Sequence, residues 1–190
     1  MVFTRNHLDG WCERGILALV LGMLVFAPLA FGAVPAWAFL VVQALALGVL
    51  GLWALRVWVD PKPRLLWPPL AWAVLAFAIY AVARYFTADI EYVARLEMMQ
   101  VLLFAFLFFA VVNNLHGQEE TTAISFTLIA VGTGAACYAV AQLTQHSNHV
   151  WNELSPYIGR ASGTYISPNN LAGLLAMLLP LALAYMLVGK

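Results

Sequence analysis

Between Arg14 and Arg56 the chain reads GILALVLGMLVFAPLAFGAVPAWAFLVVQALALGVLGLWAL, a run of 41 uncharged residues. A helix needs about 20 consecutive apolar residues to cross the hydrocarbon core of a bilayer, so this run is long enough for two crossings. Gly32 and Pro35 lie near its middle, and both residue types interrupt helices. We therefore predict two membrane helices, over residues 15–31 and 36–55.

Four further uncharged runs, of 19, 21, 32 and 29 residues, follow along the 190-residue chain. They predict four more membrane helices, over residues 65–83, 98–115, 122–143 and 171–188. The runs are rich in Leu and Ala and do not alternate as the strands of a transmembrane barrel do. With 64% hydrophobic and 9% charged residues, the chain is expected to be an all-α, polytopic integral membrane protein, with residues 1–190 forming a single helical domain.

The charge balance and the cysteines exclude several function classes. Nine basic and nine acidic residues give a net charge of zero, so the chain lacks the positive surface that nucleic-acid binding requires. Cys12 and Cys137 are far apart in sequence and form no CxxC pair. No nucleotide-binding P-loop and no H-E-x-x-H zinc motif is present. We expect no nucleic-acid partner, no cofactor and no metal.

Orientation is predicted from the Lys and Arg residues of the short loops, which prefer the cytoplasmic side. A cytoplasmic N-terminus places six basic residues inside, namely Arg5, Arg14, Arg56, Lys62, Arg64 and Lys190, and three outside, namely Arg84, Arg95 and Arg160. The long loop over residues 144–170 is then periplasmic. Arg5, Arg14 and the Ala36-Trp37-Ala38 stretch would also fit a cleaved signal peptide. A second span follows directly, which favours an uncleaved hairpin.

The loop before the last predicted span is polar and contains several glycines. Arg160 precedes Ser167, Asn169 and Asn170, three residue types that cap helix N-termini. A helix start with free N–H groups and a nearby guanidinium can hold a phosphate. The alternative is a capped helix after a turn, with Arg160 extending to water.

The segment from Arg160 to Gly173, RASGTYISPNNLAG, resembles the R-x-x-G-T-[FY]-x-[NS]-P-N-x-[FL]-A-G pattern of the O-antigen ligase and polymerase family. Two earlier segments are also similar to that family, though less specifically. Leu29-Ala30-Phe31-Gly32-Ala33-Val34-Pro35-Ala36-Trp37 is similar to its first turn, and Tyr92-Val93-Ala94-Arg95, with the aromatic helix that ends at Asn113-Asn114-Leu115, is similar to its fourth span.

This resemblance implies a glycosyltransferase of the bacterial inner membrane that acts on the periplasmic face. Its donor would be a glycan on polyprenyl pyrophosphate, and its acceptor would be lipid A core, another glycan or a protein. The resemblance implies that Arg160 binds the substrate, with Arg84 and Arg95 as second candidates. Local pairing with Asp89, Glu91 or Glu97 is the alternative for those two arginines. Further expected substrate-binding residues are Gly163, Thr164, Asn169 and Asn170.

The resemblance also implies that this chain corresponds to an N-terminal half. Family members continue through more spans and a second large periplasmic loop that carries the catalytic groups. We therefore assign no catalytic residue here and expect the 190-residue chain alone not to transfer glycans.

Three other interpretations stay open. His146, His149 and Glu153 would share one face of a helix and could hold zinc, although Ser147-Asn148 between them favours a polar loop. Polar groups within the predicted spans, at Gln43, Gln100, Thr133 and Gln142, would suit a small transporter or channel subunit. A non-catalytic membrane partner is the third alternative.

Overall fold

The computed structural model describes residues 2–59 and 65–188, and the side chains of residues 8–59 and 65–187. The described residues form six α-helices: α1 (Val2–Leu29), α2 (Ala36–Val59), α3 (Pro69–Phe86), α4 (Glu91–Asn114), α5 (Gln118–Thr144) and α6 (Pro168–Val188). All six are long and apolar enough to cross a membrane, α1 through its part Leu8–Leu29. The prediction of an all-α, polytopic membrane protein is thereby confirmed. Lys62, Arg64 and Lys190, which we counted for orientation, lie outside the described residues.

Several helices extend past the ends that we predicted. α1 begins at Val2 rather than at residue 15, and α4 begins at Glu91 rather than at residue 98. The uncharged runs mark only the apolar part of each helix, and a helix that continues through charged residues is not detected by that criterion. As a result Arg95 lies within α4, and Arg84 and Arg56 lie in the last turns of α3 and α2, instead of in loops.

The chain divides into two compact units, and the division falls within α1 and α2. Unit 1 comprises residues 1–20 and 45–117, and unit 2 comprises residues 21–44 and 118–190. We predicted a single domain over residues 1–190, and we describe each unit by itself.

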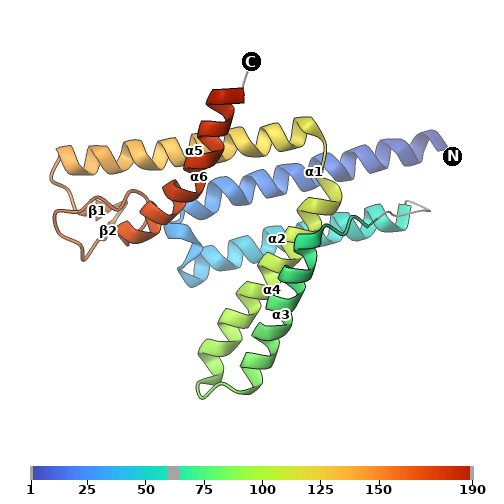
Figure 1. Cartoon of the computed structure of the whole chain (residues 1–190), viewed down its shortest axis with the longest axis horizontal. Coiled ribbons are helices and arrows are strands. Elements are labelled where there is room, and N and C mark those ends of the chain that lie inside the picture. The colour runs from blue at the N-terminus through green and yellow to red at the C-terminus, as the bar shows by residue number, and fades with distance from the viewer. Residues whose placement is uncertain (1, 60–64, 189–190) are drawn as a thin grey trace. The chain divides into compact units, whose positions relative to one another are not determined.

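In unit 1, α3 and α4 lie side by side as an antiparallel hairpin (Figure 1). Pro68 is the N-cap of α3 and Pro69 its first residue, the place where a proline costs no helical hydrogen bond. Trp67 stacks on Phe109 of α4, with ring centroids 5.2 Å apart. The side chain of Asn113 accepts a hydrogen bond from the backbone of Leu66 at 2.7 Å. The segment before α3 is thus fixed against the end of α4.

Arg56 links three helices of unit 1. Its guanidinium contacts Asp9 at 2.6 Å and Glu13 at 3.4 Å on α1, and it donates to the buried Asn114 side chain of α4 at 3.2 Å. Asp9 and Glu13 are four residues apart, so they face the same side of α1. Arg56 thus joins the N-terminal part of α1 to the ends of α2 and α4.

Unit 2 contains α5, α6, the end of α1 and the start of α2. The short 3₁₀-helix η1 (Phe31–Ala33) joins α1 to α2, with positive φ at all three of its residues. The loop between α5 and α6 carries an antiparallel pair of two-residue strands, β1 (His149–Val150) and β2 (Glu153–Leu154) (Figure 1). Buried Ala135 and Ala139 of α5 pack with Tyr165 and Leu171 to form the core of this unit.

Candidate functional site

Gln142, in the last turn of α5, organises the loop that follows. Its side chain is only 5% exposed. Its Oε1 accepts hydrogen bonds from the backbone of Ser162 and Gly163 at 3.1 and 2.9 Å. Its Nε2 donates to the carbonyls of His149 and Gly163 at 2.8 and 3.1 Å. One amide thus pairs backbone groups near both ends of the loop, and those of Ser162 and Gly163 are buried, where an unpaired group would be costly.

Gly163 lies where the loop passes close to α5. A Cβ placed on it would meet the Ala135 carbonyl oxygen at 3.0 Å and the Leu171 side chain at 3.1 Å, and its φ is +60°. Only glycine satisfies both requirements without strain. The N–H of Gly163 already donates to Gln142 and is not free for a ligand. The role of Gly163 in this structure is therefore to shape the loop. Thr164 beside it is 2% exposed, so in this structure neither expected binding residue reaches the surface.

Tyr165 and Trp151 bring the loop against the turn between α1 and α2. The Tyr165 ring covers Gly32 so closely that a Cβ there would lie 2.5 Å from Cε1. The Trp151 indole donates to the Leu29 carbonyl at 3.0 Å. Burial raises the pKa of the Tyr165 hydroxyl. Two of the sequence segments that carried the resemblance, at residues 29–37 and 160–173, therefore meet in unit 2.

Arg160 lines a pocket of about 210 Å³ at the end of α5, which combines polar side chains with Leu143, Ile158 and Ala161 and which we call the polar pocket. His146, Ser147, Asn148 and Gln142 also line it, and no carboxylate lines it among the residues that the structure describes. Arg160 is exposed and has no salt bridge or side-chain hydrogen bond to the rest of the described chain. The Asn148 Oδ1 accepts from the Gly159 backbone at 3.3 Å, which joins the two walls. The pocket offers donors and positive charge, as an anion site requires.

α6 begins beside this loop, one residue earlier than the asparagines that we considered as caps. Pro168 is its first residue, and the Ser167 carbonyl accepts from the backbone of Asn170 at 3.1 Å. Ser167 therefore occupies the N-cap position, whereas Asn169 and Asn170 lie in the first helical turn and are exposed. Of the three N-cap candidates that the sequence offered, Ser167 is therefore the one that caps α6, because proline is preferred directly after the cap. Neither asparagine lines the Arg160 pocket.

Arg84 and Arg95 belong to unit 1, at the end of α3 and in the second turn of α4. Both are exposed. Within the described part of the chain neither forms a salt bridge with Asp89, Glu91 or Glu97. Glu91 instead accepts a hydrogen bond from the Tyr85 hydroxyl at 3.1 Å.

The possible zinc ligands do not share a helix. α5 ends at Thr144, His146 follows with a φ of +51°, and His149 and Glu153 lie on the two short strands. The helix ends before Ser147 and Asn148, two residues of low helix propensity that lie in the loop. No group of three or more metal-ligating side chains is present among the described residues.

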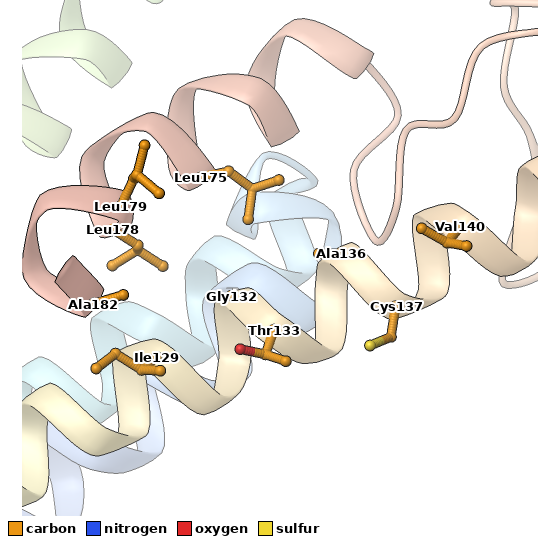
Figure 2. A pocket seen from close by; sticks show the side chains of 10 residues that line it. All are labelled: Ile129, Gly132, Thr133, Ala136, Cys137, Val140, Leu175, Leu178, Leu179 and Ala182. Carbon is orange, nitrogen blue, oxygen red and sulfur yellow. The ribbon is translucent and has the colours of Figure 1, made fainter. Parts of the chain in front are cut away.

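An apolar groove of about 570 Å³ runs between α5 and α6. Figure 2 shows Leu175, Leu178 and Leu179 of α6 opposite Ile129 and Gly132 of α5. A Cβ on Gly132 would lie 2.6 Å from Leu178, so the glycine permits close packing of the two helices. The groove extends along α5 to Val140, one helical turn before Leu143 of the polar pocket.

Fold and site together define a polytopic α-helical membrane protein with a polar pocket in the loop between its last two described helices. Comparisons with protein families, curated proteins and solved structures find no match to this chain.

Sequence reasoning identified Arg160 but missed its neighbours in the pocket. We interpreted His146 as a possible metal ligand and Gln142 as a possible transport residue, and Asn148 only as a weak helix former. The one available signal was the polar run Gln145-His146-Ser147-Asn148-His149 directly after a membrane span. That run could not show which residues the loop would bring back to it.

Proposed function

We propose that this chain forms the donor-binding part of an O-antigen ligase-like glycosyltransferase of the bacterial inner membrane. Its ligand is a glycan carried on polyprenyl pyrophosphate, and the acceptor is a lipid, a glycan or a protein. The observation that carries the proposal is the exposed Arg160 guanidinium, which has no ion pair among the described residues and lines a pocket whose described lining contains no carboxylate, at the end of a membrane helix.

The chemistry of the reaction explains why such a group matters. Displacement at the anomeric carbon releases the pyrophosphate, so negative charge develops on the leaving group. A fixed cation that contacts this group stabilises the transition state more than the ground state. Arginine suits the task because its planar donors match phosphate oxygens in a bidentate manner. Gln142 holds the loop that carries Arg160, which reduces the cost of ordering it.

The groove between α5 and α6 supports a lipid-linked donor over a soluble one. Its lining is apolar apart from the Thr133 hydroxyl and the Cys137 thiol. It ends one helical turn from the polar pocket along α5, so a single amphiphile could place its head in the pocket and its isoprenoid chain in the groove. Arg84 and Arg95, which lie in unit 1, stay predicted as second candidates for substrate binding.

The transporter alternative loses one of its polar groups in this structure. Gln142 was one of four candidates for a polar path through the helices, and both atoms of its amide are bound to backbone groups of the loop. No observation of the described residues favours transport over donor binding.

Binding of a short isoprenoid pyrophosphate tests the proposal. The purified chain in lipid nanodiscs is titrated with geranylgeranyl pyrophosphate and with geranylgeraniol, which lacks the diphosphate. We expect the pyrophosphate to bind more tightly. Arg160→Ala should weaken its binding about tenfold or more, because a hydrogen-bonded charge contact contributes roughly 1.5–3 kcal/mol. Arg160→Lys should be intermediate, since a point charge replaces a bidentate one.

Arg14→Ala is the matched control. Arg14 is also an exposed arginine, but it lies on α1 in unit 1. It should bind like the unmodified chain. Equal binding of the pyrophosphate and the alcohol, or unchanged binding by Arg160→Ala, would exclude the proposed role of Arg160.

A further inference from the structure

A second pocket, of about 470 Å³, lies in unit 2 where the α1–α2 turn meets the hairpin of the long loop. Phe26 and Trp37 line it from α1 and α2, and Trp151, Asn152 and Glu153 line it from the hairpin. Aromatic rings thus form its walls, and an amide and a carboxylate lie at its edge. The volume is within the range of small-molecule sites.

The Trp151 ring is fixed in place before any ligand arrives. One face stacks on Tyr138 of α5, with centroids 5.4 Å apart and planes at 20°. Its indole N–H donates to Leu29, and the Tyr138 hydroxyl accepts from the Trp151 backbone at 3.3 Å. The residue has a φ of +53°, a strained conformation that persists only where surrounding contacts enforce it. These contacts hold a 51% exposed indole at the pocket.

Trp37 provides the second exposed aromatic surface. It is 54% exposed and packs edge to face with Phe26, with centroids 6.1 Å apart and planes at 81°. One neighbouring ring therefore orients Trp37 while much of its surface stays uncovered. A pocket with two large exposed indoles suits a ligand that is itself amphipathic.

The polar side chains of the pocket are the Glu153 carboxylate and the Asn152 amide. Glu153 is exposed and has no salt bridge within the described part of the chain, so its oxygens are free to accept hydrogen bonds. Asn152 can both donate and accept. A sugar ring matches this arrangement, because its C–H face packs on the negative face of an indole while its hydroxyls donate to a carboxylate.

We propose that Trp37, Trp151, Asn152 and Glu153 form a binding site for a glycosyl ring, separate from the Arg160 pocket. The choice of a sugar rests on the proposed function, in which the ligand carries a glycan, because aromatic rings with a carboxylate also suit an ammonium group. The site holds a glycosyl unit by stacking and hydroxyl contacts, while the Arg160 pocket holds the diphosphate.

The test uses the full chain in nanodiscs and measures binding of D-glucose, D-galactose, N-acetyl-D-glucosamine and phosphocholine by saturation-transfer NMR and tryptophan fluorescence. We expect at least one sugar to bind and phosphocholine not to bind. Trp37→Leu should weaken sugar binding about tenfold, since one stacked aromatic contributes up to about 1.5 kcal/mol. Glu153→Gln should weaken it several-fold while leaving the fold intact.

Trp58→Ala is the matched control, because Trp58 is a strongly exposed tryptophan of α2 outside this pocket; it should bind sugar normally. Trp151→Ala is read only with a check of folding, since its indole also anchors the loop to Leu29. The proposal would be overturned if no sugar bound or if phosphocholine bound better than the sugars. It would also be overturned if Trp37→Leu and Glu153→Gln bound sugar as well as the unmodified chain does.

Failure here and failure of the proposed function give different results. If the sugar site is wrong, geranylgeranyl pyrophosphate still binds in an Arg160-dependent manner. If the donor proposal is wrong, that dependence is lost while the effects of Trp37→Leu and Glu153→Gln on sugar binding remain.

Discussion

At the scale of one residue, two glycines of the long loop differ in whether a side chain would be disfavoured by backbone conformation alone or also by close packing. Gly159 and Gly163 have similar positive φ values, +72° and +60°. A Cβ at Gly159 would meet nothing within 4 Å, whereas a Cβ at Gly163 would press on the Ala135 carbonyl and on Leu171. The left-handed backbone costs an L-residue roughly 1–2 kcal/mol at either position, and only Gly163 adds a steric cost.

We therefore expect Gly163→Ala to destabilise the loop more than Gly159→Ala does. Gly159→Ala should lower the free energy of unfolding by about 1 kcal/mol, and Gly163→Ala by roughly 2–4 kcal/mol, since overpacking adds about 1–3 kcal/mol. Denaturant titration of both variants in the same detergent gives the comparison. Equal losses would show that the contact with Ala135 and Leu171 relaxes freely.

At the scale of the element, one side chain of α5 determines the path of the loop. Gln142 pairs with the backbone near both ends of residues 149–163, and the loop itself contributes only two short strands. The pocket around Arg160 depends on this bonding, because Gln142 and residues 158–161 line it together. A polar residue in a membrane helix here has a structural role, since buried backbone groups without partners are costly.

Replacing Gln142 should release the loop without unfolding the helices. Gln142→Leu removes every partner, and we expect amide hydrogen exchange at Ser162 and Gly163 to accelerate about tenfold or more, as an unpaired buried donor costs roughly 1–3 kcal/mol. Gln142→Glu keeps the acceptor for both N–H groups but loses the donors, so its effect should be intermediate.

Gln145→Leu, three residues further along and exposed, is the control and should leave exchange unchanged. Unaltered exchange in Gln142→Leu would mean that the loop is held by Tyr165 and Trp151 alone.

At the scale of the whole molecule, the six helices imply alternating crossings. In unit 2 the α1–α2 turn and the α5–α6 loop are in contact, through Gly32 with Tyr165 and through Leu29 with Trp151. Alternating crossings require these two connections, the first and the fifth, to lie on the same side of the membrane. In unit 1 the start of α1 meets the ends of α2 and α4 at Arg56, which alternation also requires. The Lys and Arg distribution predicts that the α1–α2 turn and the α5–α6 loop are on the outer side of the membrane.

Cysteine labelling checks this orientation. In a background with Cys12→Ala and Cys137→Ala, single cysteines are placed at exposed Val34, Asp89 and Ile158 and, for the opposite face, at exposed His116. We expect a membrane-impermeant maleimide to label the first three positions in spheroplasts and His116→Cys only after permeabilisation. The reverse pattern would contradict the cytoplasmic N-terminus, and a mixed pattern would contradict six alternating crossings.

The sequence predicted the helices well and the site only in part. Uncharged runs located all six helices because the cost of a charge in the bilayer is local and additive along the chain. The same rule misplaced the starts of α1 and α4, since it cannot detect a helix that continues through charged residues beyond the apolar run. Arg160 was found from its motif, while His146 and Asn148 were not recognised as its neighbours, because that proximity depends on how the loop folds back.

The sequence by itself determined that this is an all-α membrane protein with six apolar helices and a polar loop before the last of them, because hydrophobicity and length alone decide which segments can enter a bilayer. Only the tertiary structure decided which polar residues share a pocket. Gln142 satisfies backbone groups up to 21 residues away, and Trp151 donates to a carbonyl 122 residues earlier. Contacts over such separations follow from packing in three dimensions, which no local pattern encodes.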